Sequence, residues 1–305
     1  MTALLQWMTA SSSRAILAGG ATALVASILG IAWLPAGFIV LASLAGGPWL
    51  AAAAGAGAAL MLLWWGTLAF GIALAAGVIV AVLLPSYLAA TALASTRSLN
   101  YVFQALTLCT GLLVFAIHAL FGSPEGVLMP FFARLEPYFQ QVAQWLTQMG
   151  IQASPQEIGA ETARVGWRVF GWLLLLNALL AQFVGLWAFG RLHEPGLFGR
   201  EFRRLKLGRF IAWCLVAIFT ASLISNLVLG HGWGAADDVV FVLAGAFLIQ
   251  ALAVAHGLRE LQVIGPLPLI LAYVAAALVP MALVGIGFAD TWFRFRERFA
   301  PRQGV

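Results

Sequence analysis

A long stretch without charge is the feature that most constrains this chain. Between Arg14 and Arg97 lie 82 residues with no Asp, Glu, Lys or Arg, and the first acidic residue of the chain is Glu125. About one residue in four is charged in an average soluble domain. One bilayer crossing takes about 20 apolar residues, so this stretch alone is long enough for several crossings. We therefore predict a polytopic integral membrane protein, with the lipid bilayer as its main surroundings.

The overall composition agrees with this prediction and excludes several classes of protein. Hydrophobic residues make up 63% of the chain and charged residues only 9%. This balance excludes a nucleic-acid-binding domain, a secreted disulfide scaffold and a disordered protein. Cys109 and Cys214 both lie in apolar stretches, without the spacing of a redox pair or of metal ligands. No metal site and no cofactor are expected.

Apolar runs between helix breakers predict an all-α bundle of eight or nine transmembrane segments, which forms a single integral membrane domain over residues 1–305. The runs are 15–34, 37–45, 49–65, 68–84, 101–121, 167–189, 210–229, 239–255 and 267–288. The count is eight if 37–45 only dips into the membrane. Pro35 is expected to end the first run, the Gly46-Gly47-Pro48 sequence the second, and Pro85 the fourth.

These runs form an N-terminal group (15–121) and a C-terminal group (167–288), separated by a polar region (122–166) and followed by a basic tail (289–305). We expect a protein of the cytoplasmic (inner) membrane, and the positive-inside rule favours an N-terminus on the cytoplasmic side. The Arg-rich loop, residues 190–209, then faces the cytoplasm. With nine crossings the basic tail lies outside, against the rule. A turn of the last run at Pro280, with re-entry into the membrane, removes that conflict.

The polar region is expected to lie outside the cytoplasm and to contain one amphipathic helix. Ser123-Pro124-Glu125 is typical of a helix start. Apolar residues then recur every three or four positions, at Leu128, Phe131, Leu135, Tyr138, Val142, Trp145 and Met149. Such a helix lies along the membrane interface, or alternatively covers a cavity. Ser154-Pro155-Gln156-Glu157 forms a capping box, from which a helix can continue into the 167–189 run.

No pattern in the sequence indicates an enzyme. There is no HExxH, Gly-x-Ser-x-Gly or P-loop motif, and no carboxylate lies in the middle of a predicted span. Neutral polar residues remain inside the spans, and these should face the bundle interior: Asn177, Gln182, Ser222, Asn226 and Gln250. They provide either hydrogen bonds between helices or a polar pocket for a small molecule.

The histidines and the small residues are less informative. His118 and His256 are interpreted as packed or interfacial residues, and His231, with Asp237 and Asp238, as part of a solvated outer loop. Ala15, Gly19 and Ala23 recur every four residues on one face of the first run. Such a face allows close helix packing, either within the protein or against another subunit.

Four short patterns mark the C-terminal half: Asn226 before a short loop, the run Phe247-Leu248-Ile249-Gln250-Ala251-Leu252-Ala253-Val254, Pro-Leu-Pro at 266–268, and Gly287-Phe288-Ala289-Asp290 before Arg294-Phe295-Arg296. In these the chain resembles the YybS-like bacterial integral membrane family, a domain of unknown function. Ala251 stands where that family favours Gly. The N-terminal half fits through a Pro after the first run and a Gly-rich turn.

The resemblance implies a multi-span fold and a distant similarity to substrate-binding subunits of energy-coupling-factor transporters. Those subunits bind a vitamin or metal within a helical bundle, and a small-residue helix face meets the coupling protein. ATP hydrolysis by separate subunits drives their cycle. The resemblance provides no catalytic residue.

Two hypotheses follow. In the first, the chain is a transport-associated substrate-binding subunit whose neutral polar residues line a pocket, with a coupling subunit and ATPase as partners. In the second, it is a membrane scaffold in envelope growth or division. Its Arg-rich loop would then dock cytoplasmic proteins or anionic lipid, with envelope proteins as the expected partners, through Arg200, Arg203, Arg204, Lys206 and Arg209.

Overall fold

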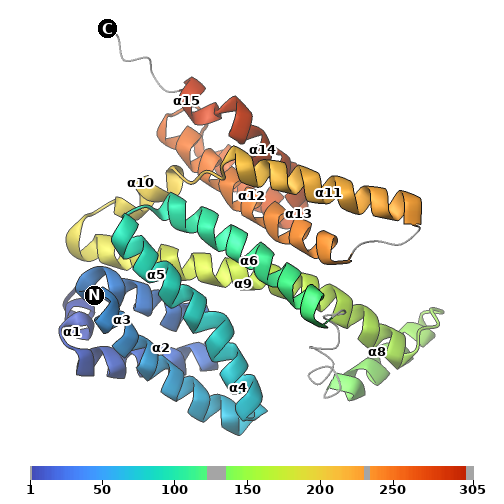
Figure 1. Cartoon of the computed structure of the whole chain (residues 1–305), viewed down its shortest axis with the longest axis horizontal. Helices are drawn as coiled ribbons and strands as arrows, with labels where there is room; N and C mark the ends of the chain where they lie inside the picture. The colour runs from blue at the N-terminus through green and yellow to red at the C-terminus, as the bar shows by residue number, and fades with distance from the viewer. Residues whose placement is uncertain (1, 122–134, 230–233, 300–305) are drawn as a thin grey trace. The chain divides into compact units, whose positions relative to one another are not determined.

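The computed structural model describes residues 2–121, 135–229 and 234–299, and within these ranges the chain forms helices and no strands (Figure 1). Seven of the described helices are long and apolar enough to cross a membrane, and a bent helix pair raises the number to eight. The all-α fold is therefore confirmed, with helices long and apolar enough for membrane spans, and the number of crossings follows from length and composition alone.

The chain divides into two compact units, and each combines residues from both predicted groups of spans. Unit 1 contains Met1–Thr107, Leu174–Ala212 and Ala246–Val305. Unit 2 contains Leu108–Leu173 and Trp213–Gly245.

The N-terminal part of unit 1 begins with α1 (Thr2–Thr9) and α2 (Ser12–Leu29). The end of the first run differs from the prediction: Gly30, not Pro35, ends the helix. Gly30 adopts a left-handed conformation (φ 69°) and its N–H donates to Ala26 O. Pro35 instead lies in the first turn of α3 (Trp33–Phe70), where its missing N–H costs no hydrogen bond.

Helix α3 is broken at Gly47, as the Gly46-Gly47-Pro48 sequence predicts. Gly47 has φ 78° and ψ −171°, outside the helical region. The predicted runs 37–45 and 49–65 are thus the two arms of one broken helix. Residues 35–44 of the first arm are all buried, which fits a segment that is apolar on every side.

Pro85 does not end a helix, contrary to the prediction. After α4 (Ile72–Val78), a π-helical turn at Ile79–Leu83 leads directly into α5 (Leu84–Thr96). Pro85 occupies the first turn of α5, and the wider π turn before it accommodates the missing N–H. The break in this region lies instead at Gly71, which has φ 89°.

The small residues of α2 pack against α3 inside the protein. A Cβ added to Gly19 would lie 2.1 Å from Ala54 O, and one added to Gly57 would lie 1.9 Å from Ile16 O. Ala15 and Ala23, on the same face of α2, are fully buried. Of the two uses that the sequence allows for this face, the structure shows packing within the chain.

The later helices are α6 (Leu99–Phe121), α8 (Glu136–Gln148), α9 (Pro155–His193), α10 (Leu197–Arg203), α11 (Arg209–Leu229), α12 (Gly234–Glu260), α13 (Pro266–Leu278), α14 (Pro280–Phe293) and α15 (Phe295–Phe299). The last apolar run does turn at Pro280, where α13 and α14 are bent by 117°.

The capping box is also confirmed. Ser154 N–H donates to Glu157 Oε2 at 2.8 Å and Glu157 N–H donates to Ser154 Oγ at 3.2 Å. From it α9 runs without interruption through the predicted 167–189 span. The amphipathic helix is present as α8, with Tyr138 and Trp145 exposed. Its predicted start at Ser123-Pro124-Glu125, with Leu128 and Phe131, lies outside the described residues.

Candidate functional site

The connector, residues 204–208, joins α10 to α11 in unit 1 and has no regular secondary structure from Leu205 onward. Its side chains alternate in environment, since Leu205 and Leu207 are fully buried while Arg204 is exposed. A non-helical segment with buried side chains needs partners for its backbone N–H and C=O groups. In this protein, amide side chains from other helices provide them.

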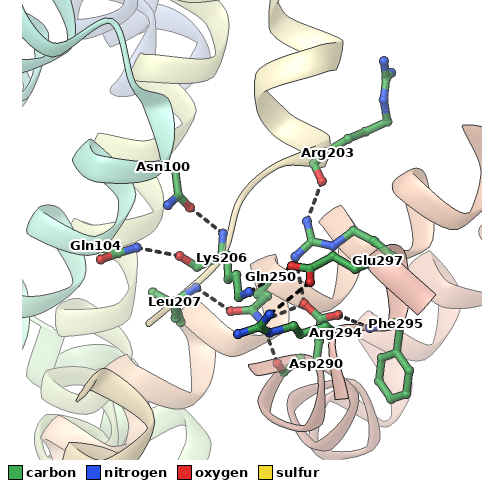
Figure 2. A network of polar contacts seen from close by, with 12 residues as sticks. Asn100, Gln104, Arg203, Lys206, Leu207, Gln250, Asp290, Arg294, Phe295 and Glu297 are labelled. Carbon is green, nitrogen blue, oxygen red and sulfur yellow. Dashed lines mark hydrogen bonds and ion pairs between the residues drawn. The ribbon is translucent and has the colours of Figure 1, made fainter. Parts of the chain in front are cut away.

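Three amides hold the connector, as Figure 2 shows. Lys206 N–H donates to Asn100 Oδ1 at 2.6 Å, and Gln104 Nε2 donates to Lys206 O at 2.9 Å. Leu207 N–H donates to Gln250 Oε1 at 2.7 Å. Residues from α6 and α12 therefore fix the path of the connector.

Gln250 links the connector to α14. It is fully buried, and its Nε2 donates to Gly287 O at 2.9 Å and to Asp290 Oδ2 at 3.2 Å. Asp290 is also buried and forms an ion pair with Arg296 at 2.8 Å; its Oδ1 accepts the Phe295 N–H at 3.0 Å. The amide of Gln250 and both carboxylate oxygens of Asp290 therefore have hydrogen-bond partners, which lowers the desolvation cost of burying these groups.

A basic cavity of about 230 Å³ borders this network. Its lining consists of five cationic and two acidic residues: Arg203, Arg204, Lys206, Asp290, Arg294, Arg296 and Glu297. The lining thus has a formal excess of three positive charges. We call this feature the basic cavity. Guanidinium and ammonium groups are hydrogen-bond donors of the kind that recognise anions in proteins.

The other polar residues singled out in the sequence make separate contacts. Gln182 is fully buried in unit 1, where its Nε2 donates to Ser86 O at 3.4 Å, and its Oε1 has no partner among the described residues. Asn177 is half-buried on α9. In unit 2, Ser222 donates to Asp237, and Asn226 Nδ2 donates to Ser222 O at 3.1 Å. Most of these contacts are of the kind expected for interhelical or local packing.

The Arg-rich loop is largely paired with acidic residues of the same unit. Arg200 pairs with Glu194 and Arg203 with Glu260. Lys206 lies 3.5 Å from Glu297, and Arg204 lies 3.7 Å from Glu201, a weak contact. Arg209 is exposed at the start of α11. Arg204 and Arg209 are therefore the members of this group best placed to meet a partner.

Sequence reasoning missed two buried carboxylates. Asp290 was not recognised because it lies near the end of an apolar run, although Arg294 and Arg296 follow it closely. The second is Asp238, which was wrongly assigned to a solvated loop. Asp237 and Asp238 lie in the first turn of α12, and Asp238 is buried. His231 lies outside the described residues.

Asp238 accepts hydrogen bonds from two helices of unit 2. His118 Nε2 lies 2.8 Å from Asp238 Oδ2, and Arg168 Nε lies 3.1 Å from Asp238 Oδ1. His118 is thus a packed histidine, as interpreted from the sequence. His256 likewise contacts the Tyr273 hydroxyl at 2.8 Å within unit 1. Over residues 2–121, 135–229 and 234–299, no three His, Cys, Asp or Glu side chains gather closely enough to hold a metal ion.

Comparison of the chain with protein-family models, with curated proteins and with solved structures finds no match.

Proposed function

We propose that this chain is a membrane scaffold that docks an anionic partner on the Arg-rich loop and the basic cavity beside it. The observation that carries the proposal is the connector, which is held by Asn100, Gln104 and Gln250. These hydrogen bonds satisfy the backbone groups of Lys206 and Leu207 and at the same time hold the connector in one path. Fixing its backbone places Arg204 and Lys206 in one position and lowers the entropy lost when a partner binds.

The setting we propose is the bacterial cytoplasmic membrane, with the N-terminus and the Arg-rich loop on the cytoplasmic side, as the positive-inside rule favours. A role in envelope growth or division fits this location. The proposal involves binding and no catalysis. The partner is an envelope protein or the anionic surface of the membrane.

The contacts give less support to a neutral polar pocket. Gln250 uses its amide to hold the connector, Gln182 bonds to Ser86, and Asn226 bonds within its own helix. The small-residue face of α2, which a coupling protein could have met, packs on α3. The hydrogen bonds and packing of these residues therefore stabilise the fold itself.

A transport-associated substrate-binding subunit is the second candidate, because unit 1 contains two broken helices. Helix α3 breaks at Gly47, and the α13–α14 pair bends by 117°. Broken helices occur in many transporters, where the exposed helix ends bind the substrate near the middle of the membrane. This candidate predicts a coupling subunit and an ATPase as partners.

Mass spectrometry of proteins that co-purify with the tagged chain from its native membrane distinguishes the two candidates. The scaffold proposal predicts envelope proteins, which are lost from Arg204→Gln/Arg209→Gln and retained by Asn226→Leu. Recovery of an ATPase with a coupling protein, unaffected by the arginine substitutions, would reject the scaffold and favour the transport subunit.

A further inference from the structure

We propose that the basic cavity binds a phosphate group, either that of an anionic phospholipid headgroup or a free phosphate ion. This inference rests on the proposed function in placing the Arg-rich loop at the cytoplasmic membrane surface. It adds the chemistry that the site recognises and the residues that recognise it.

The charges of the lining favour an anion with several oxygens. Asp290 accepts a hydrogen bond from Gln250 and forms an ion pair with Arg296, and this ion pair already neutralises its charge. The exposed cations are Arg204, Arg294 and Lys206, with 74%, 50% and 31% of their side chains accessible. Two guanidinium groups and one ammonium group can donate to different oxygens of one phosphate.

The half-buried Arg296 is held in place by two contacts. Its guanidinium donates to Asp290 Oδ2 and to Arg203 O, so it ties α14 to the end of α10. The backbone of Lys206 is fixed from the other side by Asn100 and Gln104. The cavity is therefore preorganised before an anion arrives, which favours binding.

The position of the cavity in the chain places it at headgroup depth. Arg203, Arg204 and Lys206 directly precede α11, and Arg294, Arg296 and Glu297 directly follow α14. Both helices belong to candidate membrane segments. Basic residues at the ends of such segments lie where lipid phosphates are found. A cavity of about 230 Å³ is smaller than the pockets of drug-sized ligands, about 300–1,000 Å³, and suits a headgroup.

Glu297 occupies the place of the anion in the present structure. Its carboxylate lies 3.5 Å from Lys206 Nζ and 3.3 Å from Arg294 Nη1, and 60% of its side chain is exposed. An exposed carboxylate in a five-residue helix can turn away at little cost. A phosphate then replaces it and meets the same two cations. Removing the charge of Glu297 should tighten phosphate binding.

The test uses the purified full-length protein in mild detergent. Native mass spectrometry measures retention of phosphatidylglycerol and of zwitterionic phosphatidylcholine, offered at equal concentration. In parallel, the melting temperature is measured in sodium phosphate and in sodium chloride of the same ionic strength. The variants are Arg204→Gln/Arg294→Gln and Glu297→Gln. Arg164→Gln/Arg259→Gln is the control, because it removes the same charge from exposed positions outside the cavity.

The inference expects preferential retention of phosphatidylglycerol, or a higher melting temperature in phosphate. It expects at least about a tenfold loss of affinity in Arg204→Gln/Arg294→Gln and tighter binding by Glu297→Gln. Retention of the lipid alone identifies the headgroup as the source, and the phosphate effect alone identifies the free ion. Equal behaviour of the cavity variant and the control would overturn the inference. If partner proteins are still captured in that case, the scaffold proposal stands without the phosphate site.

Discussion

Leu207 N–H donates to the side-chain carbonyl of Gln250 at 2.7 Å, although the two residues are 43 positions apart in the chain. Both residues are fully buried. This hydrogen bond joins the Arg-rich loop to α12. Through the other end of the Gln250 amide, it also joins the loop to α14. The position of the basic cavity depends on these hydrogen bonds of Gln250.

Replacing Gln250 with leucine should release the connector. The substitution leaves Leu207 N–H buried without its partner, which costs about 1–3 kcal/mol, and Gly287 O and Asp290 each lose one hydrogen bond. We expect a clearly lower melting temperature and faster protease cleavage within 204–208. Asn226→Leu is the control, because this exposed amide hydrogen-bonds within its own helix among the described residues. Equal effects of the two substitutions would contradict the role assigned to Gln250.

Removing one partner of the Asp290–Arg296 pair should destabilise the protein strongly. Asp290 is only 1% exposed, so Arg296→Met leaves a buried carboxylate without its counter-charge, a change that costs about 3–5 kcal/mol. Asp290→Asn in the Arg296→Met background removes that charge and should recover part of the loss. A double-mutant cycle on melting temperatures measures this coupling. Additive effects would show that the two side chains do not interact.

Adding a methyl group where α2 meets α3 should disrupt their packing. In Gly57→Ala the new Cβ would lie 1.9 Å from Ile16 O, so the helices must separate. We expect a destabilisation of at least about 1–3 kcal/mol, measured by thermal unfolding in detergent. A Cβ at Gly77, in α4, would meet nothing within 4 Å. Gly77→Ala should therefore be neutral or slightly stabilising.

The contacts of Glu297 should weaken at acidic pH. Desolvation raises the pKa of its carboxyl, but the charges of Lys206 and Arg294 and their hydrogen bonds lower it more, so the pKa lies below the ordinary 4.5. A carboxyl with a lowered pKa stabilises the folded state above its unfolded pKa, and this contribution is lost as pH falls through the folded pKa. The protection of the amides of 295–299 against hydrogen exchange, relative to their intrinsic rate at each pH, should therefore decrease below about pH 4.5. In Glu297→Gln this part of the pH dependence should be absent.

The sequence predicted the helices better than their ends. The charge-free stretch and the apolar runs were sufficient for an all-α membrane fold, and the Ser154–Glu157 capping box located the start of α9 correctly. The prediction that Pro35 and Pro85 end helices is wrong, because each lies in the first turn of a helix, where proline is tolerated. The φ angles of Gly30 and Gly71 mark the actual breaks, and no local pattern separates these glycines from those inside helices.

The candidate site was predicted only in part, because its contacts join residues that are far apart in the sequence. Gln250 was recognised as an interior amide, but its partners come from residues 37 to 43 positions away, and helix periodicity carries no information on them. The Arg-rich loop was recognised by its charge. The contact of this loop with Asp290 and Arg296 could not be predicted, because the contact depends on the bend at Pro280 and on the tertiary packing of α14.

The central claim, that the Arg-rich loop is the docking surface, is tested most directly by photo-crosslinking in the native membrane. A photoreactive amino acid is placed at Pro195, which is exposed in the turn between α9 and α10, and at Leu227, which is exposed on α11. The account predicts that position 195 crosslinks to an envelope protein or to anionic lipid, and that this product is absent at position 227. The account would be contradicted if position 195 gave no product, or the same products as position 227.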